Sequence, residues 1–164
     1  MEHNDLDILA VQLDEGAYKP TRGHVDDAGF DLYSPVDAEV KAHDSVIINT
    51  GVHVKIPAGY AGLIVAKSGL NTKHDLTATG LIDRGYTGSI RVKLYNNGDH
   101  DYSISDGDKI TQLVIVKVWM PKYDKDATVI DDIGESSDGR GQRRAGSQRR
   151  LYLSPDHASY LCLD

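Results

Sequence analysis

The chain alternates short apolar runs with turns, and its clearest run lies near the middle. In residues 90–95, apolar side chains at positions 90, 92 and 94 alternate with polar or amphipathic ones. A strand has a period of two, so the apolar side chains face one way and the others face the opposite way. A turn with several glycines, residues 80–88, precedes this strand and contains Asp83 and Tyr86. The pattern therefore predicts an acid and an aromatic ring at the edge of a sheet, held by a stiff strand.

Comparable patterns predict short strands along most of the chain. Residues 68 to about 74 form the one convincing helical turn, with Ser68 as a candidate N-cap. Residues 96–101 are typical of a hairpin loop. Many short strands and almost no helix indicate an all-β sandwich or barrel. The remaining predicted strands are 6–13, 29–34, two runs within 45–56, 63–66, 102–104 and 110–119.

Composition adds a domain boundary. The 164 residues are 40% hydrophobic and 26% charged, which suits one globular domain with a real core. From residue 133 onward Gly, Ser, Asp and Arg dominate, so we expect a β domain over residues 1–133 and a flexible arm over 134–164. The acidic start and the lack of a long apolar run argue against a signal peptide or membrane span. Cys162 is the single cysteine, which excludes a disulfide framework within one chain, and we expect a cytoplasmic protein.

Charge narrows the class of partner. The net charge of −7 argues against a protein that coats nucleic acid, because such proteins need excess Lys and Arg. Residues 135–164 nevertheless carry five arginines against four acidic residues. An acidic body with this tail could bind a polyphosphate if a divalent ion shared the neutralisation. On charge alone, a solubilising tail is the favoured interpretation.

Four polar clusters that contain glycine interrupt the strands. Each one alone is best explained as a turn, because Asp and Gly favour turns for backbone reasons. Asp31 could bind a metal ion or its water, or form a salt bridge. Asp83 could act as a general base or cap a turn. Tyr86 could stack on a nucleobase or lie at the edge of the core. The clusters are residues 26–31, 67–70, 81–86 and 107–112, and in the second Ser68 and Gly69 could donate backbone N–H groups to an anion or cap the helix.

Taken together and in this order, the clusters resemble the motifs of the trimeric dUTP pyrophosphatase (dUTPase) family. The resemblance covers residues from about 6 to 120 and continues weakly into the tail. Residues 80–96 look like the third motif almost residue for residue. Residues 27–34, 67–70 and 107–113 look like the first, second and fourth motifs.

The resemblance implies a jelly-roll or β-clip-like barrel that forms a homotrimer with shared active sites. Such an enzyme hydrolyses dUTP to dUMP and pyrophosphate with Mg²⁺. Asp83 would be the base that orients water towards the α-phosphorus, and Tyr86 would pack on the deoxyribose. The implied contacts are Lys67, Ser68, Gly69 and Gln112 to phosphate, Asp31 to a metal-bound water, and backbone groups of 77–82, including Thr77, Gly80, Leu81 and Ile82, to uracil.

Some positions depart from the family pattern. Lys67 replaces the usual Arg and loses bidentate geometry, and Thr77 stands where many members have Asn. In the arm, Ala145 replaces a base-stacking Phe, a loss of about 1–3 kcal/mol by analogy with single-strand binding. The arm positions that fit, and that the resemblance implies touch substrate, are Arg140, Gly146 and Ser147; Gly141 also fits.

Two alternatives remain beside the enzyme. A regulatory protein with the dUTPase fold could keep the nucleotide pocket and act through a protein partner, and the altered arm is the sequence feature that favours it. Some family members are viral, and a viral chain would work in the host cytoplasm. A dCTP deaminase shares the fold but would need a catalytic Glu where Asp83 stands.

Overall fold

A computed structural model describes residues 9–120, 127, 129 and 130 of the chain. The chain divides into two units, Met1–Met120 and Pro121–Asp164. All the helices and strands described below belong to the first unit. The start of the predicted strand 6–13, the predicted boundary after residue 133 and the arm residues Arg140, Gly146 and Ser147 lie outside the described residues.

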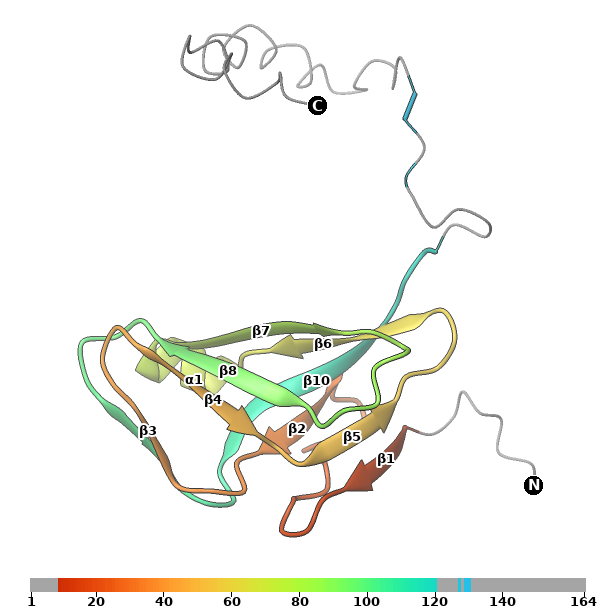
Figure 1. Cartoon of the computed structure of the whole chain (residues 1–164). Coiled ribbons are helices and arrows are strands. Elements are labelled where there is room, and N and C mark those ends of the chain that lie inside the picture. The colour runs from red at the N-terminus through yellow and green to blue at the C-terminus, as the bar shows by residue number, and fades with distance from the viewer. Residues whose placement is uncertain (1–8, 121–126, 128, 131–164) are drawn as a thin grey trace, which may run out of the picture. The chain divides into compact units, whose positions relative to one another are not determined.

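The first unit is built from ten short strands and one helix, which confirms the predicted all-β class. Six strands form a sheet in the order β2-β10-β6-β7-β8-β4, and two-stranded sheets pair β1 with β5 and β3 with β9 (Figure 1). Every pairing is antiparallel. The elements are β1 Ala10–Leu13, β2 Gly29–Tyr33, β3 Ala38–Val40, β4 Ser45–Asn49, β5 Val52–Lys55, β6 Tyr60–Val65, α1 Ser68–His74, β7 Leu76–Ile82, β8 Arg91–Asn96, β9 Tyr102–Ile104 and β10 Lys109–Lys117.

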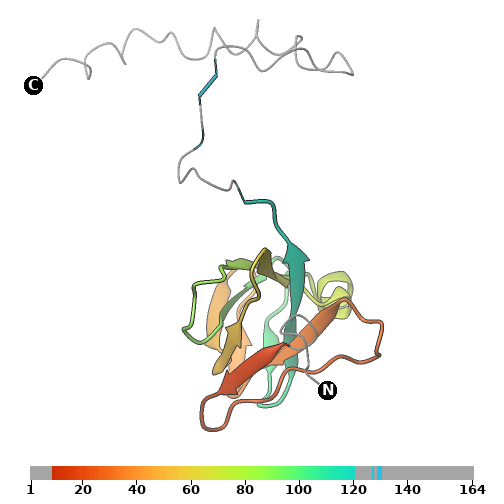
Figure 2. The same ribbon diagram turned by 90° about the vertical axis from the view of Figure 1, so that its right-hand side faces the viewer.

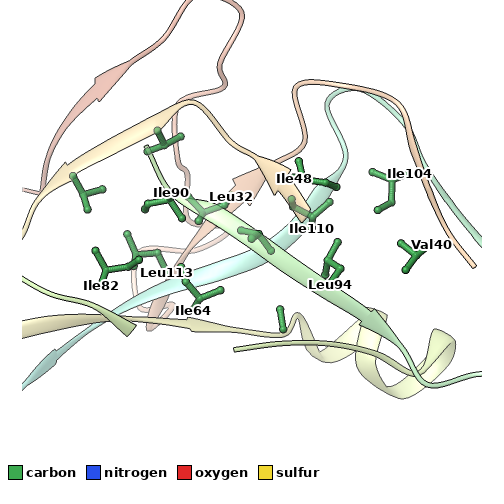
Figure 3. Packing of buried hydrophobic residues seen from close by; sticks show 14 of the residues in the cluster. Leu32, Val40, Ile48, Ile64, Ile82, Ile90, Leu94, Ile104, Ile110 and Leu113 are labelled. Atoms are coloured by element: carbon green, nitrogen blue, oxygen red, sulfur yellow. The ribbon is translucent and has the colours of Figure 1, made fainter. Parts of the chain in front are cut away.

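One face of the large sheet packs into a single apolar core. Leu32 on the edge strand β2 and Ile48 on the opposite edge strand β4 belong to the same buried cluster (Figure 3). Two edges can share one core only if the sheet curls, and the view in Figure 2 shows this curvature. The alternation predicted for residues 90–95 is confirmed, since Ile90, Val92 and Leu94 are at most 1% exposed.

The other face of the large sheet carries a second set of apolar side chains. It is formed by side chains that alternate with the core residues on β6, β7 and β10. Leu81 is 61% exposed, and its neighbours on this face are partly exposed. We call this set the outer face: Leu63, Val65, Leu81, Val114 and Val116.

Strand β7 changes partner along its length. Residues 76–78 pair with β8, whereas residues 79–82 pair with β6. The ladder between β7 and β8 therefore ends at Ala78, and the two strands separate beyond it. The sequence pattern did not predict β7 or the three-residue β3 as strands.

Two local predictions are wrong. Residues 96–101 do not close a hairpin, because β9 pairs with β3 and not with β8. The amide of Asn96 instead ties this loop to the backbone, donating to the carbonyls of Val40 and His100. The N-cap of α1 is Lys67 and no side chain caps the helix, so Ser68 is its first helical residue.

Candidate active site

Asp31 is a buried carboxylate held between two lysines. It lies on β2 and is 5% exposed, although it belongs to the face opposite the core. Lys67, at the start of α1, donates to Oδ1, and Lys109, at the start of β10, lies 2.8 Å from Oδ2. Burial raises the pKa of Asp31, but the hydrogen bonds and charges of Lys109 and Lys67 outweigh it and lower the pKa. Three of the four sequence clusters thus meet at one carboxylate.

Gln112 lies beside this ion pair. The strand register aligns Asp31 on β2, Gln112 on β10, Val65 on β6 and Thr79 on β7 in one row across the sheet. Gly29 makes room for the Gln112 side chain, because a Cβ atom at Gly29 would lie 2.9 Å from Gln112 Oε1. Lys67, which binds Asp31, follows Val65 of this row by two residues, so the structure brings the first, second and fourth clusters together.

The exposed residues Ser68 and Gly69 form the first turn of α1, directly after Lys67. A Cβ atom added at Gly69 would meet no other atom within 4 Å. The backbone N–H groups of a first helical turn have no partner within the helix. This short segment therefore presents donors beside the lysine-bound carboxylate.

The third cluster forms an exposed turn between β7 and β8. The Tyr86 amide donates to the Asp83 carbonyl at 3.0 Å, and the Tyr86 hydroxyl donates to the Ser89 carbonyl at 2.9 Å. The Tyr86 ring lies across Gly88, where a Cβ atom would come within 2.6 Å of the hydroxyl oxygen. Asp83 is exposed and Tyr86 is 43% exposed. The turn thus offers a carboxylate and an aromatic ring to a ligand outside the chain.

Because β7 changes partner after Ala78, the edge of β7 that faced β8 can bind a ligand through its backbone groups. Residues 79–82 pair with β6 on one side, and the β8 ladder stops before them on the other. Gly80, Leu81 and Ile82 therefore have an edge with polar backbone groups that can bind a base. Thr77 precedes this edge, and its hydroxyl accepts a hydrogen bond from the Asn97 amide at 3.1 Å.

Asp83 and Asp31 do not meet within one chain. From Asp31 to Thr79 there are three strand spacings, and Asp83 lies four residues beyond Thr79. At ordinary strand dimensions these offsets amount to roughly 20 Å. A single copy of the chain therefore holds two separate halves of the predicted site.

The described residues limit how a metal could bind. They contain no group of three His, Cys, Asp or Glu side chains arranged to hold a metal ion. Each Asp31 oxygen accepts one lysine, and a carboxylate oxygen can accept one more hydrogen bond. Asp31 thus retains acceptor positions that fit the predicted role of binding a metal-bound water. The described part of the chain also contains no helix long and apolar enough to cross a membrane.

Two contributors to the site were missed from the sequence. Lys109 lay within the fourth cluster, but nothing in the sequence marked it as a partner of Asp31. His53 contacts the carbonyl of Thr87 in the Asp83–Tyr86 turn at 2.8 Å. It lies 34 residues from Thr87, so only the fold brings the two together.

The geometry defines an all-β protein with two lysines paired to a buried carboxylate at one end of a sheet and an exposed acid–aromatic turn. Residues 16–142 match the dUTPase family model, and the chain belongs to the dUTPase family. The jelly-roll expectation and the family resemblance are thereby confirmed.

Similar proteins agree with this family. The deoxyuridine 5'-triphosphate nucleotidohydrolase of Eremothecium gossypii is 36% identical over 135 residues, covering 81% of this chain and 86% of the relative. A structure of the Staphylococcus bacteriophage 80alpha dUTPase with dUPNHPP has a TM-score of 0.72 and 30% identity, covering 81% of this chain and 94% of that one. A mutant dUTPase from phage phi11 of S. aureus, described with a structural Mg(II) ion, has a TM-score of 0.68 and 32% identity, covering 77% and 98%.

Proposed function

We propose that this chain is a dUTP diphosphatase that hydrolyses dUTP to dUMP and pyrophosphate. The observation that carries the proposal is the meeting of three sequence clusters at Asp31, at the end of the sheet where α1 begins. Water attacks the α-phosphorus, the bond to the bridging oxygen breaks and pyrophosphate leaves. Asp83 orients the water and accepts its proton. The enzyme needs little other chemistry, because positioning and charge neutralisation accelerate attack at phosphorus.

The phosphate end of the substrate is assigned to the lysine-rich end of the sheet. Lys67, Ser68 and Gly69 offer an ammonium group and backbone donors to the phosphate oxygens, and Gln112 offers an amide. Lys109 keeps Asp31 paired when Lys67 turns towards a phosphate. This matters because an unpaired buried carboxylate is costly.

The base end is assigned to β7. The backbone edge of Gly80, Leu81 and Ile82 reads uracil where β7 and β8 separate, and Thr77 lies at the closed end of this opening. Tyr86 packs on the deoxyribose, where a 2′-hydroxyl would clash. The arm residues Arg140, Gly146 and Ser147 are proposed to cover the bound substrate.

We assign Mg²⁺ as the cofactor. Asp31 would hold the ion through a bound water at its free acceptor position, and triphosphate oxygens and further waters would complete its ligands. When bound, the ion neutralises charge that builds up on the phosphates.

We propose a homotrimer whose copies share active sites. The roughly 20 Å between Asp31 and Asp83 in one chain supports this, since both must act on one nucleotide. The outer face, with Leu81 61% exposed, offers an apolar surface for a second copy. The cytoplasmic location and the domain boundary after residue 133 stay predictions.

The test is pyrophosphate release from dUTP, dCTP, dTTP and UTP with Mg²⁺. We expect turnover of dUTP alone, and Asp83→Asn should abolish it without unfolding the chain. Asp99→Asn is the matched control, because Asp99 is an exposed loop aspartate that contacts His43. Turnover that survives Asp83→Asn would contradict the mechanism, and tight dUTP binding without turnover would favour the regulatory alternative.

A further inference from the structure

The turn that carries Asp83 and Tyr86 is tied to neighbouring strands by two side-chain hydrogen bonds. Among the hydrogen bonds of residues 9–120, those of Asp83 and Tyr86 stay within residues 83–89. At the β8 end of the turn, Ser89 Oγ donates to Asn49 Oδ1 on β4 at 2.6 Å. Next to Tyr86, His53 Nδ1 on β5 lies 2.8 Å from the Thr87 carbonyl oxygen. The other ring nitrogen of His53, Nε2, lies 3.0 Å from Asp14 Oδ1, just after β1.

The chemistry of these two contacts determines which protonation state of His53 can satisfy both. A carbonyl oxygen and an ionised carboxylate can only accept hydrogen bonds. Both contacts can therefore be hydrogen bonds only when both ring nitrogens carry a proton. A neutral imidazole would keep its proton on Nε2, where the ionised Asp14 forms the stronger hydrogen bond, and would turn the Nδ1 lone pair towards the Thr87 carbonyl, so the Thr87 bond is the one lost.

The charged groups around His53 act in both directions. Asp14 faces the ring from the segment after β1, whereas Lys55 on β5 and Arg84 on the turn line the same pocket of about 330 Å³. The hydrogen bonds to Thr87 and Asp14 raise the pKa of His53, and burial opposes them. The doubly protonated ring is thus the form present below this raised pKa, and it is lost as the pH rises through it.

We propose that His53 is a positioning residue for the proposed hydrolysis: as an imidazolium it ties the Thr87 carbonyl, and with it the Asp83–Tyr86 turn, to Asp14 at the end of β1. The inference rests on the proposed function, because it gives that turn its chemical role. Neither His53 nor Asp14 touches the substrate in this assignment. Their effect on catalysis is the placement of the Asp83 carboxylate and the Tyr86 ring.

Asp14→Asn should make the hydrogen bond between His53 and the Thr87 carbonyl independent of the protonation of His53. An Asn amide can donate to the free lone pair of a neutral His53, so Nδ1–H stays available for Thr87. This variant should hold the turn at high pH, where wild type releases it. His53→Gln removes the titration while keeping a side chain that can donate.

The first measurement follows the turn without substrate, in the full chain. Proton–nitrogen NMR spectra recorded from about pH 5.5 to about pH 9 give the protonation of His53 and the backbone signals of residues 84–88. We expect these backbone signals to shift with the midpoint of His53, and the shift to vanish in His53→Gln. Backbone signals that do not change as His53 titrates would overturn the inference.

The second measurement is the pH profile of kcat for dUTP. Relative to Asp14→Asn, wild type should lose about three- to tenfold in kcat as the pH rises through the pKa of His53. His43→Gln is the matched control, because His43 also contacts an aspartate, Asp99 at 2.9 Å, in a loop that makes no contact with the turn among these hydrogen bonds. Parallel profiles for wild type and Asp14→Asn would overturn the inference.

The two measurements separate this inference from the proposed function. If the backbone signals of the turn follow the titration of His53 but the chain does not turn over dUTP, the positioning role of His53 is supported and the proposed hydrolysis is overturned. If the chain hydrolyses dUTP but the backbone signals of the turn do not follow the titration of His53, the positioning role of His53 is overturned and the proposed hydrolysis is supported.

Discussion

Lys109 Nζ lies 2.8 Å from Asp31 Oδ2 and joins the first residue of β10 to the middle of β2. Lys67 binds the other oxygen of the same carboxylate. The side chain of Asp31 is 7% exposed, so its charge depends on these two partners. Lys109 is 42% exposed, which weakens its share through screening by water.

Replacing Lys109 with Met should destabilise the chain by about 1 kcal/mol. The loss is moderate because Lys67 still neutralises the buried carboxylate. Urea unfolding at a fixed chain concentration measures it. Lys117→Met is the matched control, since Lys117 is an exposed lysine at the other end of β10. Equal unfolding midpoints for the two variants would show that the Lys109 pair contributes nothing.

Acid should remove the contribution of Asp31. Its folded-state pKa lies below the ordinary value of 3.8, because the two lysines outweigh burial. A lowered folded pKa gives stability that is present above 3.8 and is lost as the pH falls through the folded pKa. Urea unfolding from about pH 6 to about pH 2 should therefore show the difference between wild type and Asp31→Asn shrinking at the acid end. A difference that stays constant over this range would contradict the assignment.

Gly29→Ala should disturb Gln112. The added methyl would lie 2.9 Å from Gln112 Oε1 and 3.1 Å from its Cβ, so the side chain must shift. We expect a KM for dUTP that is several-fold higher and a stability loss of about 1 kcal/mol. In a Gln112→Ala background the same substitution should change KM much less, because the amide is already gone. Equal effects in both backgrounds would mean that Gly29 acts without Gln112.

Several elements could be predicted from the sequence because a local pattern determines them. The helix Ser68–His74 and the strand Arg91–Asn96 match their predicted ranges closely. Strand β7 was missed because its alternation is short: Thr77 and Thr79 fit a period of two, but Gly80 and the exposed Leu81 break it. Its two halves are stabilised by different neighbours, β8 and β6, which only the fold brings into place.

The candidate site shows the same limit. Asp31, Asp83 and Tyr86 stand out in sequence as polar or aromatic residues at turns and strand ends. Lys109 does not, because it reaches Asp31 through a register shift between Lys109 and Thr111 in β10. A bulge of this kind redirects a side chain and leaves no clear mark in the hydrophobic pattern.

The distance between Asp31 and Asp83 leads to a test of shared active sites. Ser68→Asp puts a negative charge where phosphates are proposed to bind, and Asp83→Asn removes the base, so each variant alone should be inactive. If each site takes its phosphate end from one copy and its turn from another, a proportion of mixed sites contains neither substitution. Random assembly of equal amounts into closed trimers makes this proportion about one quarter.

The measurement is dUTP turnover after the two variants are unfolded together and refolded. Each variant refolded alone, and each refolded with wild type, provide the controls for refolding yield. Recovery of about a quarter of the activity of refolded wild type would support sites built from two copies. A mixture as inactive as its components, with refolding shown by the wild-type controls, would place Asp31 and Asp83 in the same chain's site and contradict the separation of roughly 20 Å.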